Sequence, residues 1–316
     1  MNLQKNKPSI ICFGEVLWDV LPTQKMAGGA PMNMVFHSNN FGIDAQLISS
    51  VGNDNLGKEL RFFFYQKGIS TDLIHTNYDF PTSTVPVTLD EKGSASYEIV
   101  EPVAWDFLNA DENRKKAVSL ANLLVFGSLS CRNEKNLNTL FQLISEARKT
   151  VFDVNLRPPF YSTELIEILL RKADIVKVND EELTIIVGWY KKKYDLKEQM
   201  IFLMEKFGIE TLVMTQGKEG ALCMHEKELF EQESFPIKVK DTVGSGDSFL
   251  AAFLFKMLNG SSWQQCLEFA CATGALVAMQ SGGTPYINES MVLNFIYDRA
   301  NKYRRIKSKK RCRDVN

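Results

Sequence analysis

Residues 241–253 read Asp-Thr-Val-Gly-Ser-Gly-Asp-Ser-Phe-Leu-Ala-Ala-Phe, a glycine-rich turn that leads into an apolar helix. Gly244 and Gly246 allow the backbone to fold so that consecutive N–H groups point the same way. The helix that begins near Asp247 adds a partial positive charge at the same place. The stretch therefore predicts an anion-binding turn at the start of a helix, an arrangement suited to phosphoryl transfer.

Two roles explain Asp247. A carboxylate beside an anion site can accept a proton from a substrate hydroxyl while the N–H groups stabilise the charge on a transferring phosphoryl group. The same side chain can also cap the helix, because Asp is common before an apolar helix. Residues 244–247 alone leave both roles open.

The stretch D-T-V-G-S-G-D resembles the C-terminal signature of the ribokinase-like (PfkB) carbohydrate kinases, which is usually D-T-x-G-A-G-D. Ser245 replaces the usual alanine and is small enough for the turn. The resemblance extends over about residues 9–290 and is strongest to the fructokinases. It implies that Asp247 is the catalytic base and that Gly244, Ser245 and Gly246 form the anion hole.

The composition is that of a large globular domain. A chain of 316 residues with 45% hydrophobic composition can bury a large core, and its length allows one large α/β domain or two smaller ones. We predict one domain, which the resemblance identifies as a sugar kinase domain over residues 1–298. The formal net charge of −1 gives no reason to expect nucleic acid as a partner. Residues 299–316 are rich in Lys and Arg and are interpreted as a solvated, frayed basic tail. Contact of this tail with nucleic acid or acidic lipid is the alternative.

The cysteines and histidines form no pattern of a disulfide framework or a metal site. The sequence has six cysteines and three histidines, without CxxC spacing or neighbouring ligands. We expect reduced thiols, no structural zinc and no histidine-based nucleophilic triad. The first residues lack a cationic region followed by a long apolar stretch, so we expect a cytoplasmic protein without membrane contact.

Short β-rich runs alternate with helical patterns between about residues 9 and 279. This alternation predicts an α/β fold, a doubly wound and mainly parallel sheet with helices on both faces. The carboxyl ends of its strands should line the site. The predicted strands are residues 10–13, 45–51, 123–126, 150–154, 175–178 and 211–215.

Residues 83–100 interrupt this alternation. They read as two strands around the turn-rich residues 90–94, without a crossover helix. With the extended residues 17–26 they are expected to form a small β lid, from about residues 15–27 and 83–105, as the resemblance implies. An ordinary edge hairpin is the alternative. Such a lid would exclude water from phosphoryl transfer, and a homodimer through the lid is a further expectation.

The N-terminal motif Gly28-Gly29-Ala-Pro-Met-Asn33 precedes an apolar helix. It resembles the family's G-G-x-x-x-N, which implies that the backbone of Gly28 and Gly29 and the side chain of Asn33 bind sugar hydroxyls. Asp19 follows the first strand and can accept two hydrogen bonds from neighbouring hydroxyls. The family places a substrate-binding Asp here, and a surface turn is the alternative. Glu15 could face the sugar or simply end the strand.

Two further motifs follow in the family's order. Asn179 and Glu182 fit N-x-x-E, which implies that Asn179 approaches the triphosphate and that Glu182 helps to place a water-ligated Mg²⁺. Helix capping explains the same two residues without a metal. Thr215, Gly217 and Gly220 fit T-x-G-x-x-G, which implies contact with the phosphates and ribose of the nucleotide.

Two arginines could reach the acceptor. Arg157 closes a D-x-N-x-R motif that fructokinase-like and ketodeoxygluconate kinase-like members share, and its guanidinium offers a fork for phosphate or carboxylate, so we place it in the substrate site. Arg132 could bind an anionic acceptor or lie beside a helix cap. Residues 271–283 should border adenine, although most of the helix there is expected to be core.

Together the motifs predict an ATP-dependent sugar kinase that uses Mg-ATP, with a monovalent cation such as potassium, to phosphorylate a primary hydroxyl, with fructose as the first candidate. The alternatives within the family are ribokinase, ketodeoxygluconate kinase, a nucleoside kinase and a sugar-phosphate kinase. Outside this class, the alternative is a non-catalytic sugar-binding regulator. The sequence has no G-x-x-x-x-G-K-[ST] loop and no G-x-G-x-x-G after the first strand, which argues against a P-loop enzyme and a Rossmann oxidoreductase.

Overall fold

A nine-stranded sheet crosses the molecule in the strand order β13-β12-β11-β10-β9-β8-β1-β4-β5. The computed structural model describes residues 7–21, 24–89 and 95–311. Neighbouring strands from β11 to β5 pair in parallel, whereas β12 and β13 are added antiparallel at one edge. The strands are β1 (Ser9–Phe13), β4 (Asp44–Gly52), β5 (Ile74–Asn77), β8 (Leu123–Gly127), β9 (Thr150–Asp153), β10 (Ile175–Asn179), β11 (Thr211–Thr215), β12 (Ala221–His225) and β13 (Glu228–Gln232).

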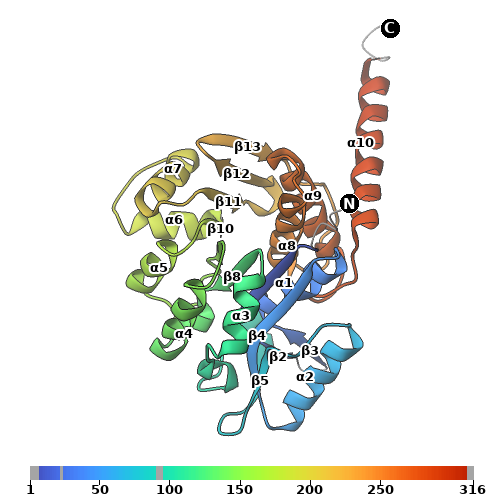
Figure 1. Ribbon diagram of the computed structural model, residues 1–316. Helices are drawn as coiled ribbons and strands as arrows, with labels where there is room; N and C mark the ends of the chain where they lie inside the picture. Colours follow the sequence, from blue (N-terminus) through green and yellow to red (C-terminus); the bar gives the residue numbers. More distant parts are fainter. Residues whose placement is uncertain (1–6, 22–23, 90–94, 312–316) are drawn as a thin grey trace, which may run out of the picture.

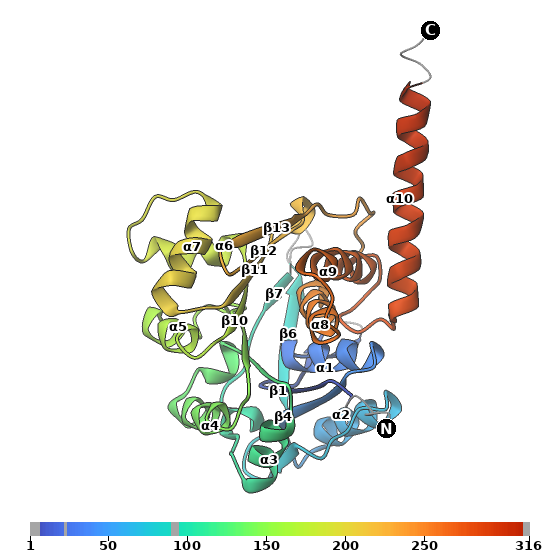
Figure 2. The ribbon, with the colours of Figure 1, turned by 45° about the horizontal axis from the view of Figure 1, so that its top comes forward.

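Helices cover both faces of this sheet (Figures 1 and 2). Alternate strand residues face opposite sides, so that Ile10 and Cys12 of β1 belong to one core cluster and Ile11 and Phe13 to the other. The first face carries α1 (Ala30–Asn40), α2 (Asn55–Gln66), α8 (Ser245–Leu258) and α9 (Trp263–Ala278). The second carries α3 (Glu112–Leu120), α4 (Glu134–Ile144), α5 (Thr163–Leu170), α6 (Asp180–Gly188) and α7 (Leu196–Phe207). Short 3-10 helices are η1 (Ala104–Phe107), η2 (Leu129–Cys131) and η3 (Gly217–Glu219).

The predicted doubly wound, mainly parallel fold is confirmed. The predicted strands correspond to β1, β4, β8, β9, β10 and β11, and their ends differ from the prediction by one residue at most. Sequence analysis did not identify β5, β12 and β13. The carboxyl ends of the parallel strands and the N-termini of α1 and α8 therefore form the frame of the site.

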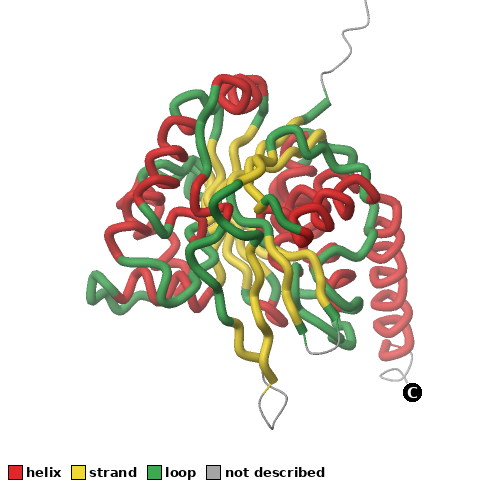
Figure 3. Tube along the Cα trace, turned by 90° about the horizontal axis from the view of Figure 1, so that it is seen from below, coloured by secondary structure: helices red, strands yellow, loops and turns green. Residues whose placement is uncertain are grey.

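A second, four-stranded sheet has the order β3-β2-β6-β7 and consists of β2 (Leu17–Val20), β3 (Lys25–Gly28), β6 (Ser83–Leu89) and β7 (Ala95–Tyr97). The antiparallel β6–β7 hairpin extends away from the body of the molecule (Figure 3). The predicted turn at residues 90–94 lies outside the described residues. The small sheet is consistent with the expected lid, and closure over a substrate stays a prediction.

The last helix, α10 (Glu289–Arg311), extends away from the rest of the molecule (Figures 1 and 2). Val292 near its start is buried in the core. The predicted domain boundary at residue 298 falls inside this helix, and the backbone of residues 299–311 is helical where a frayed tail was expected. The division into a domain and a basic tail therefore stays a prediction, and residues 312–316 lie outside the description.

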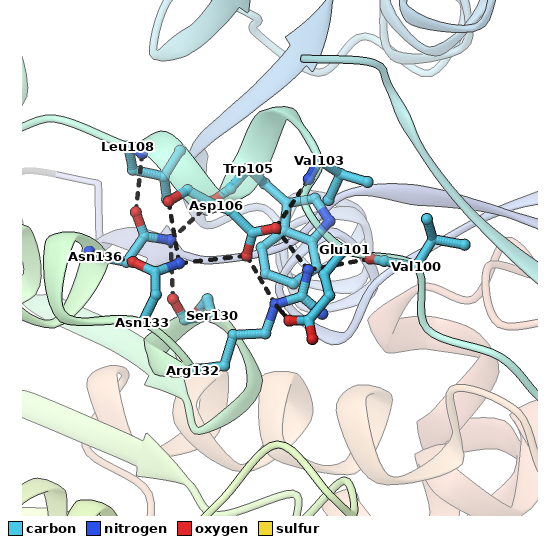
Figure 4. A network of polar contacts seen from close by, with 10 residues as sticks. All are labelled: Val100, Glu101, Val103, Trp105, Asp106, Leu108, Ser130, Arg132, Asn133 and Asn136. Atoms are coloured by element: carbon cyan, nitrogen blue, oxygen red, sulfur yellow. Dashed lines mark hydrogen bonds and ion pairs between the residues drawn. The ribbon is translucent and has the colours of Figure 1, made fainter.

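A buried ion pair fixes the segment that leads from the small sheet back to the main sheet (Figure 4). The Arg132 side chain is 2% exposed, and its Nε and Nη2 donate to the two carboxylate oxygens of Asp106 at 2.7 and 2.6 Å. Nη2 also donates to the carbonyl oxygen of Val100 at 3.1 Å, and the guanidinium lies 4.1 Å from the ring centre of Trp105. Arg132 thus holds residues 100–107 against the turn that follows β8.

We predict that Arg132→Met lowers the free energy of unfolding by about 3–5 kcal/mol, because it leaves the charge of Asp106 buried without its partner. The matched control is Lys149→Met, which removes a pair with Glu210 whose side chains are 37% and 52% exposed. Solvent screening should limit that loss to about 1 kcal/mol or less. Equilibrium denaturation of both variants measures the difference. Equal losses would contradict the assignment of Arg132 as a structural anchor.

Candidate active site

Gly244 forms the turn at which α8 begins. Its φ angle is 73°, in the left-handed region that glycine adopts without strain. A Cβ atom at this position would lie 2.5 Å from the carbonyl oxygen of Gly283, so a side chain is also excluded by space. The turn places the N-terminus of a helix of 14 residues, with its partial positive charge, beside Asp247 in the first turn.

Asp247 is held by a residue from the N-terminal half of the chain. The Asn33 Nδ2 on α1 donates a hydrogen bond of 2.7 Å to Asp247 Oδ2, although the two residues are 214 positions apart. Burial, followed by the charge of Asp153, raises the pKa of Asp247 to about 6. The hydrogen bond from Asn33 opposes this rise because it stabilises the charged carboxylate. Asp247 can therefore be ionised near neutral pH and act as a base.

The two glycines of the N-terminal motif make room for the side chain of Asp19 and for the backbone of Glu15. A Cβ atom at Gly28 would lie 2.4 Å from Asp19 Oδ2, and one at Gly29 would lie 2.6 Å from the carbonyl oxygen of Glu15. Asp19 on β2 is partly buried, and burial raises its pKa to about 6. The structure thus brings Asp19, Gly28 and Gly29 together at the end of the small sheet, directly before α1.

Glu15 is buried beside the same site, with 4% of its surface exposed. Burial raises its pKa to about 7, while backbone N–H groups and the charge of Arg157 act in the opposite direction and the charge of Asp247 adds to the rise. Its Oε2 has no hydrogen-bond partner among the described residues, and neither does Asn33 Oδ1. Two buried acceptor atoms are therefore available to a ligand that donates hydrogen bonds.

The second half of the site is a cleft of about 560 Å³, a size that suits a small-molecule ligand. It contains every residue predicted to contact the nucleotide, together with part of the predicted anion hole and of the predicted adenine border. Apolar side chains of the segment 235–239 and of α8 line it as well. Its predicted members are Asn179, Thr215, Gly217, Gly220, Ser245, Gly246, Cys271, Gly274, Ala275 and Ala278.

Asn179 and Glu182 form a reciprocal cap at the start of α6. Asn179 Oδ1 accepts from the Glu182 N–H at 2.7 Å, and Glu182 Oε2 accepts from the Asn179 N–H at 2.9 Å. Glu182 Oε1 accepts from the Leu156 N–H at 3.0 Å. The capping interpretation is therefore confirmed. It does not exclude the other role, because each carboxylate oxygen uses one bond here and keeps a lone pair that a metal-bound water could use.

Lys177 is a site residue that sequence analysis missed. It lies in the middle of β10, is 7% exposed, and its Nζ is 2.9 Å from Asp153 Oδ1. Burial lowers the pKa of Lys177, but the nearby carboxylates of Asp153, Glu182 and Asp247 outweigh this effect and raise it. A Cβ atom at Gly246 would lie 3.3 Å from Nζ, so the ammonium group lies directly beneath the first turn of α8. A lysine within an otherwise apolar strand was the available signal.

The two arginines have different positions. Arg157 is exposed, and its charge acts on Asp247 and Glu15, where it favours the ionised carboxylates. Arg132 is neutralised by Asp106 in the buried pair described above. The charge of Arg157 thus reaches both carboxylates, and substrate binding by Arg157 stays a prediction. Arg132 makes a structural contact with Asp106.

The part of the chain that the structure describes contains no cluster of three or more His, Cys, Asp and Glu side chains able to hold a metal ion. The described cysteines, Cys12, Cys131, Cys223, Cys266 and Cys271, are free and buried. Within residues 7–21, 24–89 and 95–311, no helix is both long and apolar enough to cross a membrane.

Known proteins are similar to this chain over most of its length. Probable fructokinase-5 of Arabidopsis thaliana is 27% identical, with 89% of this chain and 94% of the relative covered. The ATP-dependent 6-phosphofructokinase of Thermoanaerobacterium thermosaccharolyticum is 26% identical, with 92% and 94% covered. The crystal structure of fructokinase with bound ATP from Xylella fastidiosa superposes with a TM-score of 0.84 at 24% identity and covers 92% of this chain and 99% of its own. This likeness shows the ribokinase-like fold.

A family model described as pfkB family carbohydrate kinase matches residues 1–290. The match spans both halves of the site, from the glycine pair before α1 to the turn before α8. The chain therefore belongs to the pfkB family of carbohydrate kinases.

Proposed function

We propose that this carbohydrate kinase transfers the γ-phosphoryl group of ATP to a primary hydroxyl of a neutral sugar, with fructose as the preferred acceptor and Asp247 as the general base. The observation that carries the proposal is the position of Asp247, which the Asn33 amide holds at 2.7 Å beside the N-terminus of α8 and next to a nucleotide-sized cleft. The fructokinases among the similar proteins, such as probable fructokinase-5 of Arabidopsis thaliana, support the choice of sugar.

The two carboxylate oxygens of Asp247 would have different roles. Asn33 fixes Asp247 Oδ2, and no hydrogen bond to Oδ1 is seen within the described part of the chain. Oδ1 would accept the proton of the acceptor hydroxyl as that oxygen attacks the γ-phosphorus. The bond from the γ-phosphorus to the bridging oxygen breaks, ADP leaves, and the sugar keeps the phosphoryl group.

The first turn of α8 would stabilise the charge on the transferring group. The Ser245 N–H donates to the carbonyl oxygen of Thr242 at 3.2 Å, so the N–H groups of Gly244 and Gly246 would supply the donors, and the helix terminus adds a partial positive charge. The ammonium group of Lys177 lies beneath Gly246 and adds a full positive charge. The cleft residues Asn179, Thr215, Gly217 and Gly220 would hold the nucleotide, because a cleft of about 560 Å³ suits a small-molecule ligand.

Magnesium fits the donor set in one respect. Glu182 is 6% exposed, and each of its oxygens accepts one backbone hydrogen bond, which leaves lone pairs for metal-bound water. When bound with ATP, Mg²⁺ would neutralise charge on the phosphates, and Glu182 would hold it through water, since Mg²⁺ keeps several of its waters. A requirement for a monovalent cation such as potassium stays a prediction.

The acceptor side of the site favours a ligand with hydroxyl groups. Glu15 Oε2 and Asn33 Oδ1 are buried and without partners among the described residues, and the carboxylate of Asp19 lies close by in sequence and structure. All three groups accept hydrogen bonds when the carboxyls are ionised, so sugar hydroxyls would satisfy them. A phosphorylated or carboxylated acceptor would bring a negative charge to carboxylates, which costs binding energy.

A sugar-phosphate acceptor is the second candidate, because Arg157 is exposed at the site and one relative is a 6-phosphofructokinase. The single positive charge of Arg157 would have to offset the repulsion between the phosphate of the acceptor and the carboxylates of Asp19, Glu15 and Asp247. Arg132, the other cation that sequence analysis considered for this role, is paired with Asp106 and does not serve it. Homodimerisation through the small sheet and a cytoplasmic location also stay predictions.

We predict that Asp247→Asn lowers turnover by about 10²-fold or more while sugar binding is largely retained, because the amide keeps the size of the side chain but cannot accept the proton. Steady-state kinetics with Mg-ATP and the best sugar measure this. Asp195→Asn is the matched control, since Asp195 caps α7, does not line the cleft and should affect turnover little. Near-parental turnover of a folded Asp247→Asn protein would show that Asp247 has only a structural role.

We predict that fructose gives the highest kcat/KM among fructose, ribose, ketodeoxygluconate, adenosine and fructose 6-phosphate. The reason is the set of hydrogen-bond acceptors on the acceptor side of the site. Release of ADP from Mg-ATP, measured for each acceptor in parallel, tests the order. A higher value for fructose 6-phosphate or ketodeoxygluconate would assign Arg157 to the acceptor and replace the fructokinase proposal, while the kinase chemistry would stand.

We predict that Asn33→Ala moves the acidic limb of the kcat/KM profile to higher pH, by about 1 pH unit. A base must be deprotonated, so activity is lost as the pH falls through the pKa of Asp247, which is raised to about 6. Loss of the Asn33 donor removes a contact that favours the charged carboxylate, and this raises the pKa further. Asn39→Ala, on the same helix but bonded to Val35 and Ala45, is the control. An unmoved limb in Asn33→Ala would refute the coupling.

A further inference from the structure

The chain between α9 and α10 passes directly against the start of α8. A Cβ atom at Gly244 would lie 2.5 Å from the carbonyl oxygen of Gly283 and 2.6 Å from its Cα. A Cβ atom at Gly283 would lie 3.0 Å from Asn33 Nδ2, the donor that holds Asp247. Gly283 therefore contacts both the anion-hole turn and the amide that positions the base, and a displacement of Gly283 would disturb both.

A carboxylate ties this segment to the loop before α8. Asp241 Oδ2 accepts from the Gly282 N–H at 2.9 Å, and Asp241 Oδ1 accepts from the Val243 N–H at 3.0 Å. One side chain thus links both segments through their backbones. This link leaves the carbonyl oxygen of Gly283 to be fixed by another residue.

His37 supplies that contact. It lies on α1 one turn after Asn33, so the two side chains share a face of the helix. The imidazole is 0% exposed, and its Nε2 lies 2.9 Å from the carbonyl oxygen of Gly283. Because a carbonyl oxygen only accepts, Nε2 must carry the proton. The ring also packs edge-on against Phe36, with ring centres 5.3 Å apart.

We propose that His37 is a positioning residue for phosphoryl transfer: by holding the Gly283 carbonyl, it fixes the Gly244 turn and the Asn33 amide, and through them the anion hole and Asp247. The proposal rests on the proposed function, because it takes Asp247 as the base. Within the described part of the chain, the His37 side chain does not line the cleft and has no hydrogen bond to Asp247, so it acts through Gly283.

The chemistry of the buried ring agrees with a fixed donor. Burial lowers the pKa of His37 to about 4, so the ring is neutral at the pH of ordinary assays and does not exchange protons with the reaction. Its Nδ1 has no partner among the described residues, which costs stability. An apolar side chain of similar size would avoid that cost, so the polarity of His37 serves its bond to Gly283.

The test compares His37→Leu, which removes the donor, with His37→Gln, whose amide nitrogen can replace Nε2. We expect His37→Leu to lower kcat by about tenfold or more, with the KM of the best acceptor sugar within about threefold of the parent. His37→Gln should recover kcat to within about threefold of the parent. The pH profile of His37→Gln should keep the parental shape, since the ring is not an acid or base in the reaction.

A second readout needs no turnover. Hydrogen exchange of the backbone amides of residues 244–247, measured without ligands, should be faster in His37→Leu than in the parent and in His37→Gln. Val35→Ala is the matched control, because Val35 is buried on the same helix. Within the described part of the chain it makes no hydrogen bond to Gly283. It should lower stability while it leaves kcat and this exchange close to parental values. Failure of the Asp247 assignment would not alter the exchange result, so the two proposals can fail separately.

Three results would overturn the proposal. The first is parental kcat and parental amide exchange in His37→Leu. The second is a loss of kcat in Val35→Ala that matches the loss in His37→Leu at equal loss of stability. The third is a His37→Gln protein that is folded but as slow as His37→Leu, or that loses a limb of the pH profile. If His37→Leu does not fold, His37→Asn replaces it, because its shorter amide cannot reach the Gly283 carbonyl.

Discussion

The hydrogen bond between Asn33 and Asp247 is the contact on which the site depends. It joins the N-terminal turns of α1 and α8, which lie next to each other on one face of the main sheet although 214 residues separate the two side chains. Burial and the charge of Asp153 favour the protonated carboxyl, and this contact opposes both because it stabilises the carboxylate. The fold therefore does more than bring two motifs together, because the contact also lowers the pKa of the proposed base.

The same constraint explains the charges beneath α8. Asp153 and Lys177 form a buried pair, and Asp247 lies close enough for both to affect its pKa in opposite directions. A buried pair of this kind is costly unless its partners are well placed. The Lys177 ammonium lies under Gly246, where it can approach an anion held by the helix terminus.

The sequence predicted the parts of the fold whose signals are local. The apolar runs of β1, β4 and β8–β11 marked the parallel strands within one residue, because a strand covered on both faces is apolar throughout. It missed β13, whose residues Glu228–Gln232 are mixed in polarity and partly exposed, as an edge strand can be. Motifs likewise predicted Asn33, Asp247 and the cleft residues. Lys177 and the Arg132–Asp106 pair were missed because their meaning depends on partners distant in sequence.

The most direct test of the account is a crystal structure of the protein with fructose and a non-hydrolysable Mg-ATP analogue. The account predicts a primary hydroxyl of the sugar within about 2.6–3.2 Å of Asp247 Oδ1. It also predicts the γ-phosphoryl group on the N–H groups of Gly244 and Gly246, with Asn33 still bonded to Oδ2. A sugar whose primary hydroxyls lie away from Asp247 while the phosphates occupy the turn would contradict the account.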